Sequence, residues 1–163
     1  MKTILLILFI TLSGFSAGKE VITEAKAVKV EEKSVYNYSK AIELVKKYEG
    51  FRSKKYELFG HFYIGYGHLI TSKENFDSLT ETRATELLKK DFNKGLKQVK
   101  KYARGANDNK RLVLACYVYN CGIGSLLRSG LIKDISKYKK TCYVGGKWFK
   151  SLEKRRIDEL NLL

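Results

Sequence analysis

The stretch from Glu49 to His68, EGFRSKKYELFGHFYIGYGH, differs in composition from the rest of the chain. Over residues 51–70 aromatic residues and glycines alternate, a pattern typical of short strands joined by tight turns. Before this stretch, a helical apolar spacing begins after Ser39, which can cap a helix, and Gly50 can end that helix. The sequence therefore predicts a helix with Glu49 in its last turn, followed by a small hairpin-rich lobe.

The chain after this lobe is predicted to be helical. Ser78 and Glu81 have the spacing of a capping box, with Thr80 as the competing cap, and the helix they open continues to about residue 102. After a polar break over 105–109, we interpret the apolar run LVLACYVY as a central buried helix, because its surroundings are helical. Two shorter helices are expected near 125–135 and 151–162. The predicted fold class is α+β, mainly helical.

The amino-terminal residues 1–17 have the order of a secretory signal peptide. A short positive segment precedes the apolar run ILLILFITL, and small residues lead to a cleavage position near Ala17 or Gly18. We expect export to the periplasm or the cell exterior. The alternative is an uncleaved anchor, which is the only membrane contact that we predict. Residues 18–38 are charged and are expected to form a spacer, which leaves 39–163 as the domain.

The chain is strongly basic. Its 32 Lys and Arg against 17 Asp and Glu give a formal net charge of +15, and 44% of its residues are hydrophobic. That hydrophobic share can form a buried core and argues against disorder. In an exported protein the charge indicates an anionic envelope polymer as partner. Nucleic acid is not expected, because the lysines are scattered and no recognition motif is present. We expect a monomer with no cofactor and no metal, since the cysteines and histidines lack zinc-site spacing.

Four segments of the chain carry motifs in a specific order. The first is E-G-F-R at 49–52 with Tyr56 and G-H-F-Y-I-G-Y-G-H at 60–68, and the second is L-T-E through Asp91 at 79–91. The third is 112–124, which ends in Y-N-C-G-I-G, and the fourth is the glycine pair at 145–146 followed by L-x-x-R-R-x-x-E at 152–159. Together they resemble the phage-type lysozymes, glycoside hydrolase family 24. The resemblance covers about residues 39–163. It implies a two-lobed lysozyme-like fold and hydrolysis of the β-1,4 bond between N-acetylmuramic acid and N-acetylglucosamine in peptidoglycan.

In this resemblance Glu49 matches the catalytic general acid. Glycoside cleavage needs a carboxylic acid that protonates the leaving oxygen. The negative end of a helix macrodipole favours the neutral acid, whereas pairing with Arg155 or Arg156 of the closing helix would favour the ionised form. The sequence leaves these two effects in opposition. The alternative interpretation of Glu49 is an ordinary surface carboxylate at a helix end.

The second carboxylate of the family's pattern is missing. Leu58 stands where the family has aspartate, and Tyr63 stands where it has threonine. Glu57 is a catalytic candidate that can activate the attacking water, or it faces solvent beside a lysine. Tyr63 can hydrogen-bond the water or fill its place, and His61 is a further candidate to hold it.

Other positions are candidates to contact substrate. They are Tyr66, His68, Asn120 and Arg155. The alternative for Tyr66 is a place in the core, and for His68 a structural role that holds the hairpin against the preceding helix. Asn120, at a predicted helix end beside glycines, is suited to bind a sugar amide. Cysteines 116, 121 and 142 can form one disulfide in any of three pairings or remain free thiols.

The expected function is that of a muramidase with Glu49 as general acid. The alternative is a catalytically inactive peptidoglycan-binding or structural protein on the same fold. A third possibility is a cationic protein that disrupts membranes by charge. Activity that is lost in Glu49→Gln would identify the first, and killing that survives this change would favour the third.

Overall fold

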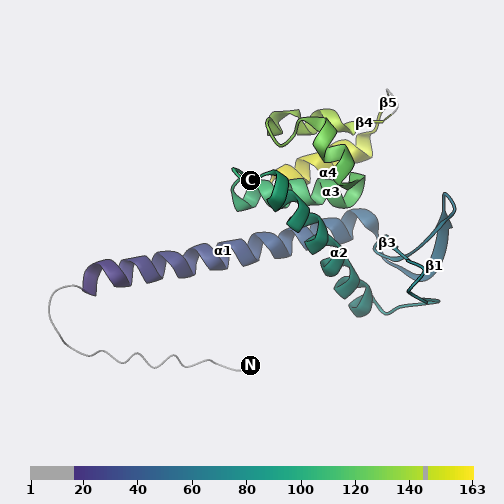
Figure 1. Cartoon of the computed structure of the whole chain (residues 1–163), viewed down its shortest axis with the longest axis horizontal. Coiled ribbons are helices and arrows are strands. Elements are labelled where there is room, and N and C mark those ends of the chain that lie inside the picture. Colours follow the sequence, from purple (N-terminus) through teal and green to yellow (C-terminus); the bar gives the residue numbers. More distant parts are fainter. Residues whose placement is uncertain (1–16, 145–146) are drawn as a thin grey trace. The chain divides into compact units, whose positions relative to one another are not determined.

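The computed structural model of the 163-residue chain describes residues 17–144 and 147–163 (Figure 1). The predicted signal peptide, except for Ala17, lies outside the described residues. The chain divides into two units, residues 1–33 and 34–163. The second unit contains the sheet and all described helices apart from the first half of helix α1.

Helix α1 runs from Ala17 to Glu49. Its end is as predicted, because Gly50 follows with φ 69° and its N–H donates to the Lys46 carbonyl at 3.0 Å. The predicted start at Ser39 is wrong, since the helix continues back to Ala17. Residues 18–38 are rich in Glu and Lys and hold no proline, so the stretch expected as a spacer has good helix propensity.

The predicted hairpin lobe is confirmed. Strands β1 (Arg52–Leu58), β2 (His61–Gly65) and β3 (His68–Leu69) form an antiparallel sheet in that order. Phe59 and Gly60 alone connect β1 to β2, with φ 52° and 75°. Positive φ at both positions is the requirement of a two-residue type I′ turn, which glycine meets easily and phenylalanine does not. The turn sets the register that pairs Leu58 with His61.

Three α-helices form the rest of the domain: α2 (Glu81–Tyr102), α3 (Asp108–Ser129) and α4 (Lys150–Leu160). Thr80, not Ser78, caps α2 by accepting from the Arg83 N–H. The helix predicted over 125–135 does not form as a separate element. Its first residues complete α3 beyond a kink at Gly122, and a 3-10 helix follows at Ile135–Cys142. A two-stranded hairpin, β4 (Tyr143–Val144) and β5 (Lys147–Trp148), precedes α4.

The core is built around α3, as predicted for the apolar run. Residues 112–118 are all buried, and they pack with Ala41, Ile42 and Val45 of α1 and with Phe92 of α2. Helix α2 packs against α3 and also contacts strands β2 and β3. It therefore joins the hairpin lobe to the helical lobe.

Candidate active site

Glu49 is fixed at the junction of the two lobes. Its Oε1 lies 2.9 Å from Nη2 of Arg155, whose side chain is only 6% exposed. The two atoms form an ion pair, and neither makes a hydrogen bond within the described residues. Arg155 also donates from Nε to Oε1 of Glu159 at 2.9 Å. Burial by itself would lower the pKa of the Arg155 guanidinium. The carboxylates of Glu49 and Glu159 outweigh this effect, so that the pKa is raised.

The second oxygen of Glu49 points at the backbone of the hairpin lobe. A Cβ atom on Gly67 would lie 3.7 Å from Glu49 Oε2, and Gly67 has φ 84°. Glycine here keeps open the space in front of the carboxyl group. Glu49 is therefore held on one side by Arg155 and has its other oxygen toward the space beside Gly67.

A buried polar network supports Arg155 from behind. Arg156, fully buried, donates to Glu159 Oε2 at 2.6 Å and to Asn120 Oδ1 at 2.6 Å. Tyr138 donates its hydroxyl to Glu159 Oε2 at 2.8 Å. Glu159 closes the L-x-x-R-R-x-x-E motif, but no role was predicted for it, and Tyr138 was not predicted to belong to the site. The spacing of Arg155 and Arg156 to Glu159, four and three residues on one helix, was the signal that could have identified the glutamate.

This network changes the interpretation of two candidate substrate contacts. Arg155 is buried and shared between two carboxylates, which favours a role in positioning Glu49 over contact with a sugar. Asn120 is exposed, but its carbonyl oxygen is taken by Arg156. The structure therefore ties Asn120 to the framework of the site.

Tyr66 joins the hairpin lobe to the helices and is 3% exposed. Its hydroxyl donates to Glu81 Oε1 at 2.6 Å, and its carbonyl accepts from the Tyr119 hydroxyl at 2.7 Å. Burial and the neighbouring Glu81 raise the pKa of Tyr66. Burial and these two hydrogen bonds favour the alternative interpretation of Tyr66, a place in the core.

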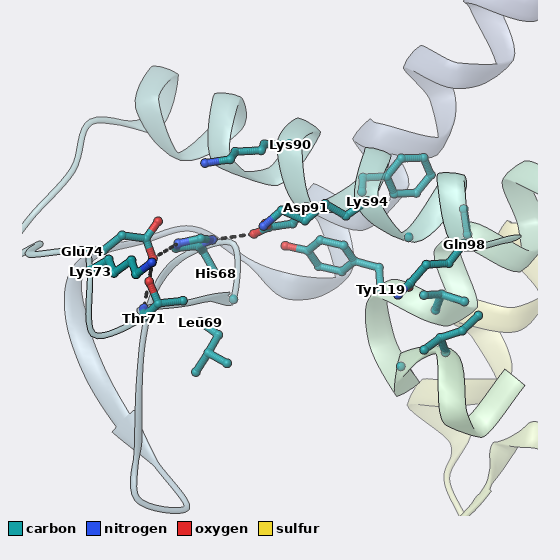
Figure 2. A pocket seen from close by; sticks show the side chains of 17 residues that line it. His68, Leu69, Thr71, Lys73, Glu74, Lys90, Asp91, Lys94, Gln98 and Tyr119 are labelled. Atoms are coloured by element: carbon teal, nitrogen blue, oxygen red, sulfur yellow. Dashed lines mark hydrogen bonds and ion pairs between the residues drawn. The ribbon is translucent and has the colours of Figure 1, made fainter. Parts of the chain in front are cut away.

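His68 fastens the hairpin lobe to α2 and is 5% exposed (Figure 2). Its Nδ1 lies 2.5 Å from Asp91 Oδ2, and its Nε2 lies 3.3 Å from Glu74 Oε2. The hydrogen bond with Asp91 raises the pKa of His68 although burial opposes this. Burial alone would raise the pKa of Asp91, but His68 and Lys94 lower it overall. The structural alternative for His68 thus fits, with α2 as the partner in place of α1.

One side of the hairpin carries a pair of stacked tyrosines. Tyr56 and Tyr63 are directly paired across the strands and stack with ring centroids 5.9 Å apart. Burial is the main reason that the pKa of Tyr119, in α3, is raised. The charges of Glu49 and Tyr56 raise it further. The stacked Tyr56–Tyr63 pair marks one side of the hairpin.

Alternation along the strands places the remaining candidates relative to that side. Leu58 and His61 form a directly opposed pair two residues from the Tyr56–Tyr63 pair, so they share its side of the sheet. Glu57 pairs with Phe62 and projects from the opposite side. Glu57 is exposed, on the side of the sheet opposite Tyr56 and Tyr63.

A pocket of about 650 Å³ lies between the hairpin lobe and helices α2 and α3 (Figure 2). Gly67 and Tyr119 line it, and Gly67 is the residue beside Glu49 Oε2. Within residues 17–144 and 147–163, no group of three or more His, Cys, Asp or Glu side chains could hold a metal ion. The three cysteines are free thiols, buried at 116 and 142 and exposed at 121.

Comparison with known proteins agrees with this architecture. Residues 46–160 match the family model for phage lysozyme. An endolysin of Bacillus phage B103 is 30% identical over 140 residues, which cover 77% of this chain and 53% of the relative. The chain thus spans about half the length of that relative.

Solved structures share the fold. An endolysin from Escherichia coli O157:H7 phage FAHEc1 is 26% identical with a TM-score of 0.58, over 76% of this chain and 89% of that chain. The muramidase domain of SpmX from Asticaccaulis excentricus is 22% identical with a TM-score of 0.66, over 75% of this chain and 92% of that chain. The predicted lysozyme-like α+β fold is confirmed. Because the family model matches most of its length, this chain belongs to the phage lysozyme family of glycoside hydrolases.

Proposed function

We propose that the protein is a muramidase that hydrolyses the β-1,4 bond between N-acetylmuramic acid and N-acetylglucosamine in peptidoglycan. The observation that carries the proposal is the placement of Glu49. The carboxyl group is paired with a buried arginine through Oε1, while Oε2 lies beside Gly67, a residue that lines the pocket. Family membership supplies the reaction class.

Glu49 would act as the general acid through Oε2. Oε2 is the oxygen that Arg155 does not contact, so we place the transferred proton on it, beside Gly67 of the pocket wall. Arg155 contacts the other oxygen, so it limits rotation of the carboxyl group and stabilises the carboxylate left after proton transfer. Glu159 and Tyr138 keep Arg155 in place through the buried network.

The attacking water would be held by the hairpin face that carries Tyr56, Leu58, His61 and Tyr63. His61 brings an imidazole to that face, whereas Glu57 projects from the other side. We therefore assign water activation to the His61 imidazole and water orientation to the Tyr63 hydroxyl. Leu58, 48% exposed, supplies no polar group at this place.

The proposed substrate also fits the charge and the expected location of the protein. A net charge of +15 favours encounter with an anionic wall polymer, by a steering effect that salt weakens. We propose that residues 1–17 direct export, which would bring the domain to peptidoglycan. A single bound copy is sufficient, because Glu49, Arg155 and the pocket all belong to one chain.

The alternative function is an inactive peptidoglycan-binding protein. It is favoured by Leu58 and Tyr63, which place an apolar side chain and a bulky ring where water must be activated. In that case the pocket would bind glycan strands without cutting them.

Release of reducing ends from purified peptidoglycan distinguishes the two functions. We expect the wild-type chain to release them and Glu49→Gln to lose about 10²–10⁴-fold in rate, the usual contribution of a general acid. His61→Gln should lose activity, whereas the matched change Glu57→Gln should not, with folding checked by circular dichroism. No release by the wild type, while the protein still sediments with the wall, would contradict the muramidase proposal and support the binding function.

A further inference from the structure

Three lysines line the pocket beside His68. Lys73 comes from the segment after β3, and Lys90 and Lys94 come from α2 (Figure 2). Nζ of Lys94 pairs with Oδ1 of Asp91 at 3.1 Å. Among the residues that the structure describes, neither Lys73 nor Lys90 has an ion-pair or hydrogen-bond partner. Two unpaired ammonium groups therefore flank the same pocket.

The acidic side chains in this wall are already engaged. Asp91 is bound by His68 and Lys94. Glu74 accepts from the backbone N–H of Thr71 at 3.0 Å and from its hydroxyl at 2.8 Å, besides contacting His68. The pKa of Glu74 is lowered, mainly by these two hydrogen bonds from Thr71. Neither carboxylate is left to neutralise the two lysines.

The rest of the pocket suits a sugar chain. Leu69, Ala115, Val118 and Ile123 give it apolar surface, and Gln98 and Tyr119 add polar groups. One end, at Gly67, adjoins Glu49. A strand that reaches Glu49 could thus extend through the pocket and bring its substituents to the lysines.

We propose that Lys73 and Lys90 form a subsite for the carboxylates of the peptide stems that peptidoglycan strands carry. This inference rests on the proposed function, since it requires the strand to occupy the pocket. The stems are attached to the strand itself, so their carboxylates arrive together with the bond to be cut. Phosphodiesters of other wall polymers share the anionic chemistry but are not fixed at that distance from the bond.

The test compares two double variants of the full chain. Lys73→Met/Lys90→Met removes the subsite. Lys89→Met/Lys97→Met removes the same charge from exposed positions of α2 that do not line the pocket. Each is assayed for hydrolysis and for sedimentation on phosphate-free wall, on the same wall with its carboxylates chemically amidated, and on wall that retains phosphate polymers. Sedimentation is measured in the Glu49→Gln background, so that binding does not depend on catalysis.

We expect the subsite variant to reduce the preference for charged over amidated phosphate-free wall about fivefold, the size of two solvent-exposed ion pairs. The control variant should keep that preference. An equal loss in both variants would mean that only overall charge matters, and no loss would mean that no subsite exists. A loss confined to phosphate-bearing wall would assign the lysines to phosphodiesters and overturn the proposal. Lysine-dependent binding without any hydrolysis would contradict the proposed function and leave the subsite standing.

Discussion

Removing the His68–Asp91 pair should destabilise the protein in a pH-dependent way. The histidine side chain is 6% exposed and the aspartate side chain 21%, and together they join β3 to α2. Loss of one partner from a buried pair typically costs about 3–5 kcal/mol in free energy of unfolding. Asp91 is partly exposed and would keep Lys94 as a partner, which reduces the cost. We expect His68→Asn to cost about 3 kcal/mol in free energy of unfolding, the lower end of this range. For a domain of this size that corresponds to a decrease in Tm of roughly 6–12 °C.

The two pKa shifts set the pH range of this stabilisation. The raised pKa of His68 gives a contribution that is complete below its unfolded value, about 6.5, and is lost as pH rises through the folded value. The lowered pKa of Asp91 gives a contribution to stability that is complete above the unfolded pKa, about 3.9. This contribution is lost as pH falls through the folded pKa. The pair should therefore stabilise most between about pH 4 and 6.5.

The assay is urea unfolding of the wild type, His68→Asn, Asp91→Asn and the double variant at pH 5.5 and pH 9. The double-mutant cycle should give a coupling energy of about 2 kcal/mol at pH 5.5 and clearly less at pH 9. His61→Asn, which changes an exposed histidine, serves as the control and should alter stability by less than about 0.5 kcal/mol. A coupling energy near zero, or one that does not change between the two pH values, would refute the reasoning.

Other variants test further features. Gly67→Ala places a Cβ 3.7 Å from Glu49 Oε2 at φ 84°, so peptidoglycan hydrolysis should fall at least about tenfold; unchanged turnover would contradict the open space assigned to the acid. Phe59→Asn relieves positive φ at a 91% exposed position and should raise the free energy of unfolding by about 0.5–1 kcal/mol in urea titrations; a loss of stability would show that the phenylalanine makes a needed contact. Arg156→Met leaves Glu159 buried without its closest partner, so unfolding should become easier by about 3–5 kcal/mol, whereas a neutral effect would mean that Arg155 alone compensates the carboxylate.

Features that depend on residues close together in the sequence could be predicted. Gly50 ends α1, the glycines and aromatic residues over 51–70 form a hairpin lobe, and the apolar run LVLACYVY is the buried helix. Each follows from backbone freedom or periodicity within a few residues. The start of α1 was missed, because Ser39 has the chemistry of a cap but stands inside a continuous helix-favouring stretch.

Features that depend on distant partners could not be predicted in the same way. Tyr66 and Asn120 have side chains that suit a sugar, yet Glu81 and Arg156 bind them from other elements. The orientation of Glu57 depends on the Phe59–Gly60 turn, because the register of the hairpin decides which side each residue faces. A sequence shows which side chains can bind, and the fold decides which of them are already occupied.

The central claim is hydrolysis of a specific glycosidic bond with Glu49 as the acid. Its most direct test is mass spectrometry of the products released from purified peptidoglycan, after borohydride reduction of the new reducing ends. The account predicts fragments that end in reduced N-acetylmuramic acid and carry one added water, formed by the wild type and absent with Glu49→Gln. Fragments that end in reduced N-acetylglucosamine, or equal amounts of product from Glu49→Gln, would contradict it.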